Sequence, residues 1–308
     1  MRLNTMTSSI LHQVLSDETN VVYFPTLGLF DQILYLTNSN FFIFANNLKS
    51  CADNCRCLNG DFIDLYDYDI CCANSVMSYK RQCSQLSDRI NLNPIIFEHN
   101  LPDMGIKKED RFILNNDLTK IKKIFFDTTV MKSWGFDNSV LYDYGIPTHK
   151  FFPLPDVKKV KSILISSANQ GNSPVLGNQL KQHFEDKLEL QCDVINNMSE
   201  VSIDNVNKVF NSYEIFVDLN NRTIDCLCAA SAGMYSISLS NLKNINNVPN
   251  ISQVNTIEDI VNIVPVVKDK NINIEETHKY IDEHFNFNKF ESIINSIFKN
   301  VKREAKVL

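Results

Sequence analysis

The sequence of 308 residues predicts an α/β protein made of two halves, each with a parallel sheet, closed by C-terminal helices. Three observations support this prediction. Short apolar segments alternate with helix-length segments, as they do in βαβ units. A proline-rich stretch, 145–160, interrupts the alternation, which then starts again. Finally, the chain finishes on a long amphipathic segment.

The first half is expected to hold six strands. Each candidate is a short, mostly apolar run, such as NVVYF or PIIFEHN, bounded by polar or helix-length segments. The expected strands are 20–24, 40–46, 68–75, 94–100, 121–129 and 138–146. Helices are expected over 77–90 and from residue 108 toward the fifth strand.

The stretch 145–160 is expected to link two domains, because Pro147, Pro153 and Pro155 disfavour both a helix and a central strand. In the last segment, apolar residues from 290 to 301 recur on one face of a helix. After the linker, strands are expected at 161–169, 188–195, 213–219 and 234–240, and helices at 175–187, 202–211, 222–232 and 257–264. We therefore expect two Rossmann-like domains, 1–150 and 151–285, facing across a cleft, and a C-terminal helix, 286–308, packing back across both.

Charge and cysteine content limit the classes of function. The net charge of −6 disfavours a broad electrostatic grip on nucleic acid or anionic lipid, although it leaves room for a local basic patch. Nine cysteines, an odd number, indicate reduced thiols in a cytoplasmic protein. The spacing of Cys51, Cys55 and Cys57 is not that of a zinc finger, so no metal site is predicted. No signal peptide or long apolar window is present, so no stable membrane insertion is expected.

The most informative stretch is YEIFVDLNNRTIDCLCAASAGMYSISLSN, where a strand, a polar turn, a small-residue helix and a second strand follow each other. The strand is expected to end near Asp218, and Asn221 is a good helix N-cap. A helix N-terminus at the carboxyl end of a strand favours anions, and Arg222 and Thr223 would strengthen that preference. Asp225, one turn further, could accept hydrogen bonds from a ribose. Alternatively, these residues only cap the helix and complement its dipole.

Two other strand ends carry candidate residues. Glu98 and His99 follow the fourth expected strand, where they could orient an acceptor hydroxyl or transfer a proton. The alternative is a hydrogen-bonded loop histidine without a catalytic role. Thr26 and Gly28 follow the first strand and could let the backbone approach a diphosphate or an acceptor, or they could form a plain turn.

In this layout the sequence resembles the GT-B glycosyltransferases, which bind a nucleotide-sugar donor between two Rossmann-like domains. In their retaining, family 4-like branch, the second domain carries E-x7-E followed by EAxAxGxPVV. The stretch DLNNRTIDCLCAASAGMYSIS has that shape, with Asp225 in the place of the second acid and Gly233 in that of the glycine. Asp218 precedes Asp225 by seven residues rather than eight, and SSANQGNSP lacks the family's basic residue. NPIIFEHNLP and IFFDTTVMKSWGFDNSVLYDYGIP resemble passages of the family's first domain.

The resemblance implies an enzyme that moves a hexose or pentose from a nucleoside-diphosphate sugar, its co-substrate, without a metal or other cofactor. Glu98 and His99 would be the catalytic pair, and Thr26 and Gly28 would lie on the acceptor side. The implied donor-binding residues are Ser166, Ser167, Asn169, Asp218, Asn221, Arg222, Thr223 and Asp225.

The sequence leaves the acceptor open. One candidate is a hydroxymethylated base of viral DNA, as in phage DNA-modifying enzymes, because the Asn-, Ile- and Lys-rich composition is typical of AT-rich genomes. The protein would then act in the host cytoplasm. The others are a surface glycan or a lipid-linked sugar. Two rival classes remain: a catalytically degenerate GT-B module that binds a nucleotide or a protein, and another two-domain Rossmann protein.

Overall fold

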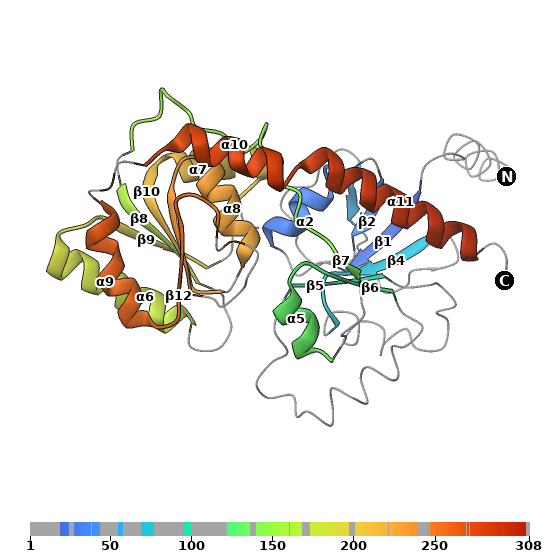
Figure 1. Cartoon of the computed structure of the whole chain (residues 1–308), viewed down its shortest axis with the longest axis horizontal. Helices are drawn as coiled ribbons and strands as arrows, with labels where there is room; N and C mark the ends of the chain where they lie inside the picture. Colours follow the sequence, from blue (N-terminus) through green and yellow to red (C-terminus); the bar gives the residue numbers. More distant parts are fainter. Residues whose placement is uncertain are drawn as a thin grey trace, which may run out of the picture.

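The computed structural model describes residues 19–24, 28–37, 39–43, 55–57, 69–76, 95–99, 122–135, 140–159, 161–167, 173–196, 201–220, 222–239, 245, 247–268, 270 and 272–305. They form two α/β units, each built around a parallel sheet (Figure 1). The sheets are consecutive in the chain, and residues 142–160 link the last strand of the first to the first strand of the second.

The first sheet has seven parallel strands in the order β3-β2-β1-β4-β5-β6-β7. Its central strands β4 and β5 read ICCA and IIFE and are buried along their whole length, as in a sheet covered on both faces. The strands are β1 Asn20–Phe24, β2 Asn40–Ile43, β3 Cys55–Cys57, β4 Ile70–Ala73, β5 Ile95–Glu98, β6 Lys122–Phe125 and β7 Val140–Leu141. The described helices of this unit are α2 Leu29–Leu34 and α5 Thr128–Ser133.

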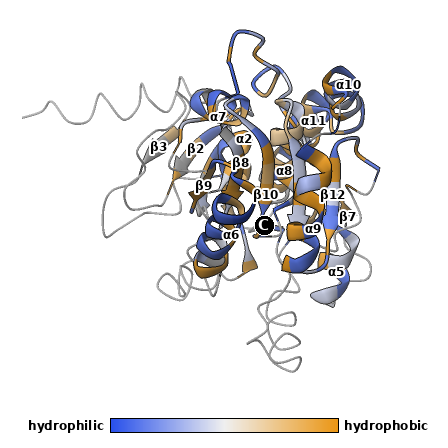
Figure 2. Cartoon of the chain, turned by 90° about the vertical axis from the view of Figure 1, so that its left-hand side faces the viewer, coloured by the Kyte–Doolittle hydropathy of each residue, from blue (hydrophilic) through white to orange (hydrophobic). Residues whose placement is uncertain are grey.

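The second sheet has five parallel strands in the order β12-β11-β10-β8-β9. Its strands are β8 Lys161–Ser166, β9 Cys192–Ile195, β10 Tyr213–Asp218, β11 Tyr235–Leu239 and β12 Ile251–Val254. The helices of this unit are α6 Ser173–Leu188, α7 Ile203–Asn211, α8 Thr223–Ser231, α9 Ile257–Lys268 and α10 Ile274–His284. Figure 2 shows both hydrophilic and hydrophobic positions on outer helices such as α6 and α9, as expected of helices that bury one face. Helix α8 instead is buried along its whole length.

The chain crosses between the two units twice. The linker leads from β7 to β8, and helix α11, Phe287–Ala305, returns from α10 to the first unit. The crossings lie side by side, because Ile146 pairs with Asn286 and its N–H donates to the carbonyl of Phe285 at 2.8 Å. In Figure 1, α10 lies over the second unit and α11 over the first. The two C-terminal helices together therefore cover both units.

Most predicted strands and helices are present within a few residues of their expected bounds. The expected strand 121–129 is too long, because Asp127 caps α5 by accepting hydrogen bonds from the N–H groups of Thr129 and Val130. Four short or polar elements were not predicted: β3, β12, α2 and α10. Helix α9 continues past its expected end and includes Pro265. The expected helices over 77–90 and from residue 108 lie outside the described residues.

Candidate active site

The carboxyl ends of strands from both sheets converge on Arg222. A Cβ atom added to Gly28, between β1 and α2, would lie 3.8 Å from Nη1 of Arg222 at the start of α8. Burial raises the pKa of Asp31, a rise that the positive charge of Arg222 opposes, and burial together with that charge lowers the pKa of His99; both residues belong to the first unit. Burial also raises the pKa of Asp218 in the second unit, and the charge of Arg222 opposes that rise. We call the place where these residues meet the interdomain site.

The turn before α8 is organised by Asp218 rather than by Asn221. Asp218 is fully buried, and its carboxylate accepts hydrogen bonds from the N–H of Asn220 at 2.9 Å and of Arg222 at 2.6 Å. The N-cap position belongs to Arg222, so the expectation that Asn221 caps the helix is wrong. Asn221 itself lies outside the described residues. Asp218 thus fixes the backbone from which the Arg222 guanidinium projects.

Asp225 and Thr223 are buried in the first turn of α8, and their polar atoms have no hydrogen-bond partner among the described residues. Asp225 is 0% exposed, and both of its carboxylate oxygens are buried and lack a hydrogen-bond partner among the described residues. The Oγ1 atom of Thr223 is likewise buried and lacks such a partner. Burial raises the pKa of Asp225 to about 7, a rise that Arg222 opposes and Asp218 reinforces. Buried polar groups are usually hydrogen-bonded, so these atoms are suited to a ligand that supplies the partners.

Ser166 and Ser167 lie at the carboxyl end of β8, next to the Asp218 turn. Oγ of Ser166 accepts a hydrogen bond from the Asn220 side chain at 3.1 Å, and Oγ of Ser167 donates to Asn196 at 3.2 Å. Both serines are buried. Through these contacts Ser166 supports the turn, and Ser167 ties the end of β8 to the end of β9. Asn169 lies outside the described residues.

Glu98 and His99 are neighbours in sequence but do not form a pair in the structure. The Glu98 carboxylate accepts a hydrogen bond from the N–H of Val76 at 2.9 Å and thereby holds the end of β4. The His99 ring instead places Nδ1 3.2 Å from the hydroxyl oxygen of Tyr144. Burial, aided by Arg222, lowers the pKa of His99 to about 3, so the imidazole is neutral at physiological pH. The structure thus separates Glu98, which supports the fold, from His99, which faces Arg222.

Sequence reasoning missed Asp31, which organises the first unit's side of the site. Its buried carboxylate accepts hydrogen bonds from the Tyr23 hydroxyl, from the Gly28 N–H at 2.8 Å and from the Asn74 amide at 2.6 Å. Through these bonds it ties the loop after β1 to the end of β4. A signal existed, since an acid three residues after Gly28 fits a capping box at a helix start. Thr26 lies outside the described residues.

Among the described residues, no cluster of His, Cys, Asp or Glu has the arrangement of a metal site. Within the same part of the chain, no helix is long and apolar enough to cross a lipid bilayer. The interdomain site consists of the cation Arg222, the buried acids Asp218 and Asp225 of the same unit, the acid Asp31 of the other unit and the neutral His99. It can bind an anion at Arg222 and hydroxyl groups at the unpartnered oxygens nearby.

Several solved structures are similar to this chain over both sheets. The match to sucrose-phosphate synthase from Thermosynechococcus elongatus covers 92% of this chain and 99% of the synthase chain, with a TM-score of 0.64 and 9% sequence identity. The match to HepE from Anabaena, in complex with UDP and glucose, has the same two coverages, a TM-score of 0.63 and 8% sequence identity. The match to a glycosyltransferase from Rickettsia africae also has these coverages, with a TM-score of 0.58 and 12% sequence identity. No protein-family model matches the sequence, and no curated protein matches it. The chain has the GT-B fold that the sequence resemblance predicts.

Proposed function

We propose that this protein is a glycosyltransferase that uses a nucleoside-diphosphate sugar. The observation that carries the proposal is the set of shielded, unpartnered polar atoms beside Arg222, on Thr223, Asp225 and His99. They come from both halves of a GT-B fold, and the similar HepE structures contain UDP and UDP-glucose. A donor with one anionic and one hydroxyl-rich end matches this distribution of charge and hydrogen-bonding groups.

In this proposal the diphosphate lies against Arg222 and the first turn of α8. The guanidinium and the helix dipole would stabilise the negative charge of the leaving diphosphate, so we propose that the transfer needs no metal ion. The hydroxyls of the ribose or of the sugar would meet Asp225 and Thr223. Ser166 would support the turn that aims Arg222, and Ser167 would hold the adjoining strand ends together.

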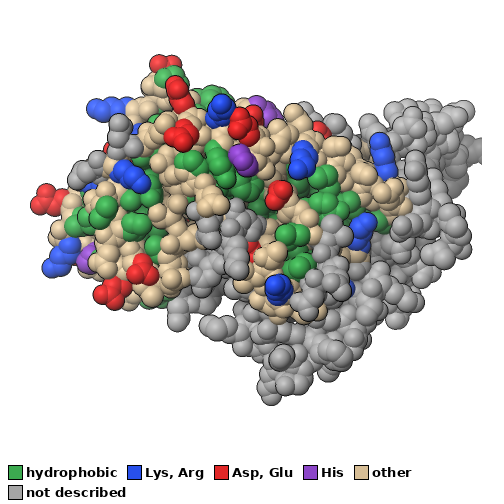
Figure 3. Space-filling view, in the orientation of Figure 1, with side chains coloured by type: hydrophobic (Ala, Val, Ile, Leu, Met, Phe, Trp, Pro, Cys, Tyr) green, Lys and Arg blue, Asp and Glu red, His purple; other side chains and the backbone are tan. Residues whose placement is uncertain are grey.

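The acceptor would approach from the first unit, where His99 and Gly28 border the site. For a hydroxymethylated base of viral DNA, the enzyme would also need a basic strip for the DNA backbone. On the face in Figure 3, Lys and Arg side chains alternate with Asp and Glu over the described residues, and no single-sign strip stands out. We propose a cytoplasmic enzyme with the acceptor to be assigned by experiment.

The test is a thermal-shift screen of UDP, GDP, ADP and CMP and of their sugars. At a ligand concentration near 100 times Kd, binding stabilises the fold by about 2.7 kcal/mol, which raises Tm by several degrees. The stabilising donor is then incubated with the protein alone, with hydroxymethylated DNA and with a glycan, and release of the nucleoside diphosphate is followed. Release that an acceptor accelerates supports transfer. Binding without any release favours a degenerate module, and no binding at all contradicts the proposal.

A further inference from the structure

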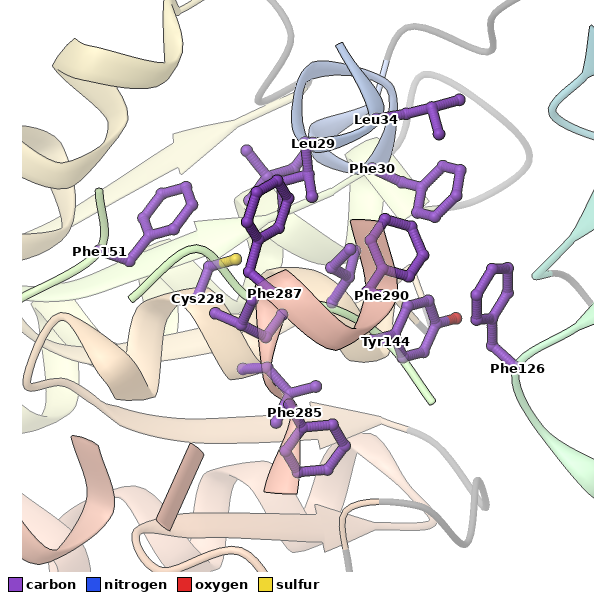
Figure 4. Close-up of a cluster of buried hydrophobic side chains, with 14 of the residues drawn as sticks. Leu29, Phe30, Leu34, Phe126, Tyr144, Phe151, Cys228, Phe285, Phe287 and Phe290 are labelled. Atoms are coloured by element: carbon purple, nitrogen blue, oxygen red, sulfur yellow. The ribbon is translucent and has the colours of Figure 1, made fainter. Parts of the chain in front are cut away.

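Tyr144 connects the interdomain site to an aromatic stack inside the first unit. It lies just before the first crossing, is 4% exposed, and stacks on Phe126 with centroids 4.6 Å apart and planes 11° apart. Its hydroxyl oxygen lies 3.2 Å from Nδ1 of His99. Figure 4 shows Tyr144 with Phe126, Phe290 and Phe30 in this cluster. The hydroxyl is thus the polar tip of an otherwise apolar group that reaches the site.

The aromatic stack also fixes the ring of His99. The imidazole stacks on Phe126 with centroids 4.7 Å apart and planes 6° apart, and it lies 4.1 Å from the Phe30 ring. With the ring fixed and Nδ1 facing Tyr144, Nε2 is the nitrogen left for other contacts. Nε2 is shielded from solvent and has no hydrogen-bond partner among the described residues. It is therefore the atom of His99 that a ligand would meet.

Burial, reinforced by the surrounding charges, keeps both partners neutral. Burial and the carboxylates of Asp127, Asp225 and Glu98 raise the pKa of Tyr144, so the phenol retains its proton. The imidazole is neutral because burial and Arg222 lower its pKa to about 3. A neutral imidazole has one N–H donor and one acceptor nitrogen, and the hydrogen bond at one nitrogen determines the role of the other. Because a phenol is the better donor and an imidazole nitrogen the better acceptor, the Tyr144 hydroxyl donates to Nδ1.

We propose that Tyr144 is a positioning residue that holds neutral His99 with its proton on Nε2, so that this nitrogen donates a hydrogen bond to an oxygen of the bound donor. His99 then acts as a neutral donor and not as the base that takes the acceptor's proton. This inference rests on the proposed function for the identity of the ligand. The tautomer itself rests only on the contacts of Tyr144 and His99.

The test is ¹⁵N NMR of the protein labelled at its histidines, with His99 assigned from the spectrum of His99→Gln. In the wild type we expect Nε2 to be the protonated, pyrrole-type nitrogen and Nδ1 to be the pyridine-type nitrogen. In Tyr144→Phe, which keeps the ring stack and removes only the hydroxyl, the two frequencies should move toward each other. Tyr142→Phe makes the same change on the neighbouring half-buried tyrosine and should leave them in place.

Kinetics give a second readout of the same variants. Losing the orientation of one neutral hydrogen-bond donor should lower kcat/KM by about tenfold in Tyr144→Phe and should leave it unchanged in Tyr142→Phe. A wild-type spectrum with the proton on Nδ1, or unchanged frequencies in Tyr144→Phe, would overturn the inference. The expected spectra without any transfer or donor hydrolysis would instead contradict the proposed function and leave the tautomer assignment intact.

Discussion

Replacing Arg222 by glutamine should weaken the binding of the nucleoside diphosphate while leaving the fold unchanged. The 2.6 Å hydrogen bond to Asp218 comes from the backbone N–H of residue 222, which glutamine also has, so the start of α8 should be preserved. A charge-assisted hydrogen bond contributes about 1.5–3 kcal/mol, which corresponds to a loss of affinity of about 10- to 150-fold. We expect the upper part of this range. Without the guanidinium, the diphosphate would face Asp31, Asp218 and Asp225, whose charges Arg222 now offsets.

Isothermal titration with UDP, or with whichever nucleotide the screen selects, measures this loss directly. The matched control is Lys181→Gln, which removes a cation from the surface of α6, where Lys181 pairs with Glu185 at 3.6 Å. The control should bind as the parent does, because this surface pair lies outside the interdomain site and exposed pairs contribute little. If Arg222→Gln keeps its Tm and binds the nucleotide within about twofold of the parent, Arg222 does not contact the diphosphate and the site is misplaced.

The remaining predictions concern stability. Because the pKa of Asp225 is about 7 in the fold and 3.8 for an ordinary aspartate, as in the unfolded chain, the folded protein holds a proton that the unfolded chain loses, and stability falls as pH rises from about 4 to 7. Asp225→Asn should remove this fall in stability, which reaches up to about 4 kcal/mol at pH 8. Urea titrations of the parent and the variant at pH 5 and pH 8 measure it, and a difference in the free energy of unfolding between the two proteins that is the same at both pH values would refute the prediction. Gly145→Ala should destabilise by about 3 kcal/mol or more, since the new Cβ would lie 2.2 Å from Cβ of Phe290. Gly28→Ala, whose Cβ has ordinary contacts, should change the free energy of unfolding by less than about 0.5 kcal/mol, and equal losses in the two alanine variants would contradict the packing argument.

The sequence predicts the central strands well because their burial leaves a continuous signal. Strands β4 and β5 are short, fully buried runs made almost entirely of apolar residues, and both were expected. Edge elements bury only one side or part of their length. Strand β12 reads ISQV and is mostly half-buried, and α10 buries only Thr277 and Ile281. Such elements are stabilised by their neighbours in the fold rather than by a pattern of their own.

The residues of the site likewise divide into those that the sequence reveals and those that it does not. Asp218, Arg222 and Asp225 follow a buried strand within one local turn, so their sequence order reveals them. Asp31 and Tyr144 become part of the site only through partners elsewhere in the chain. Asp31 bonds to Asn74, 43 positions away, and Tyr144 reaches His99 from 45 positions away. A single sequence does not contain these pairings, because they depend on which strand ends become neighbours in the sheet.

The relative placement of the two units is what brings the site together, and it depends on the paired crossings. Tyr144 immediately precedes Gly145, which packs directly against Phe290 of α11. The next residue, Ile146, is tied to Phe285. The position of Tyr144 is therefore set at the same point of the chain that sets the position of one unit against the other. Gly145→Ala should consequently shift the ¹⁵N frequencies of His99 as well as lower stability, although residue 145 contacts neither the histidine nor the proposed ligand. Unchanged His99 frequencies in a destabilised Gly145→Ala protein would show that the crossing holds the units together without positioning the site.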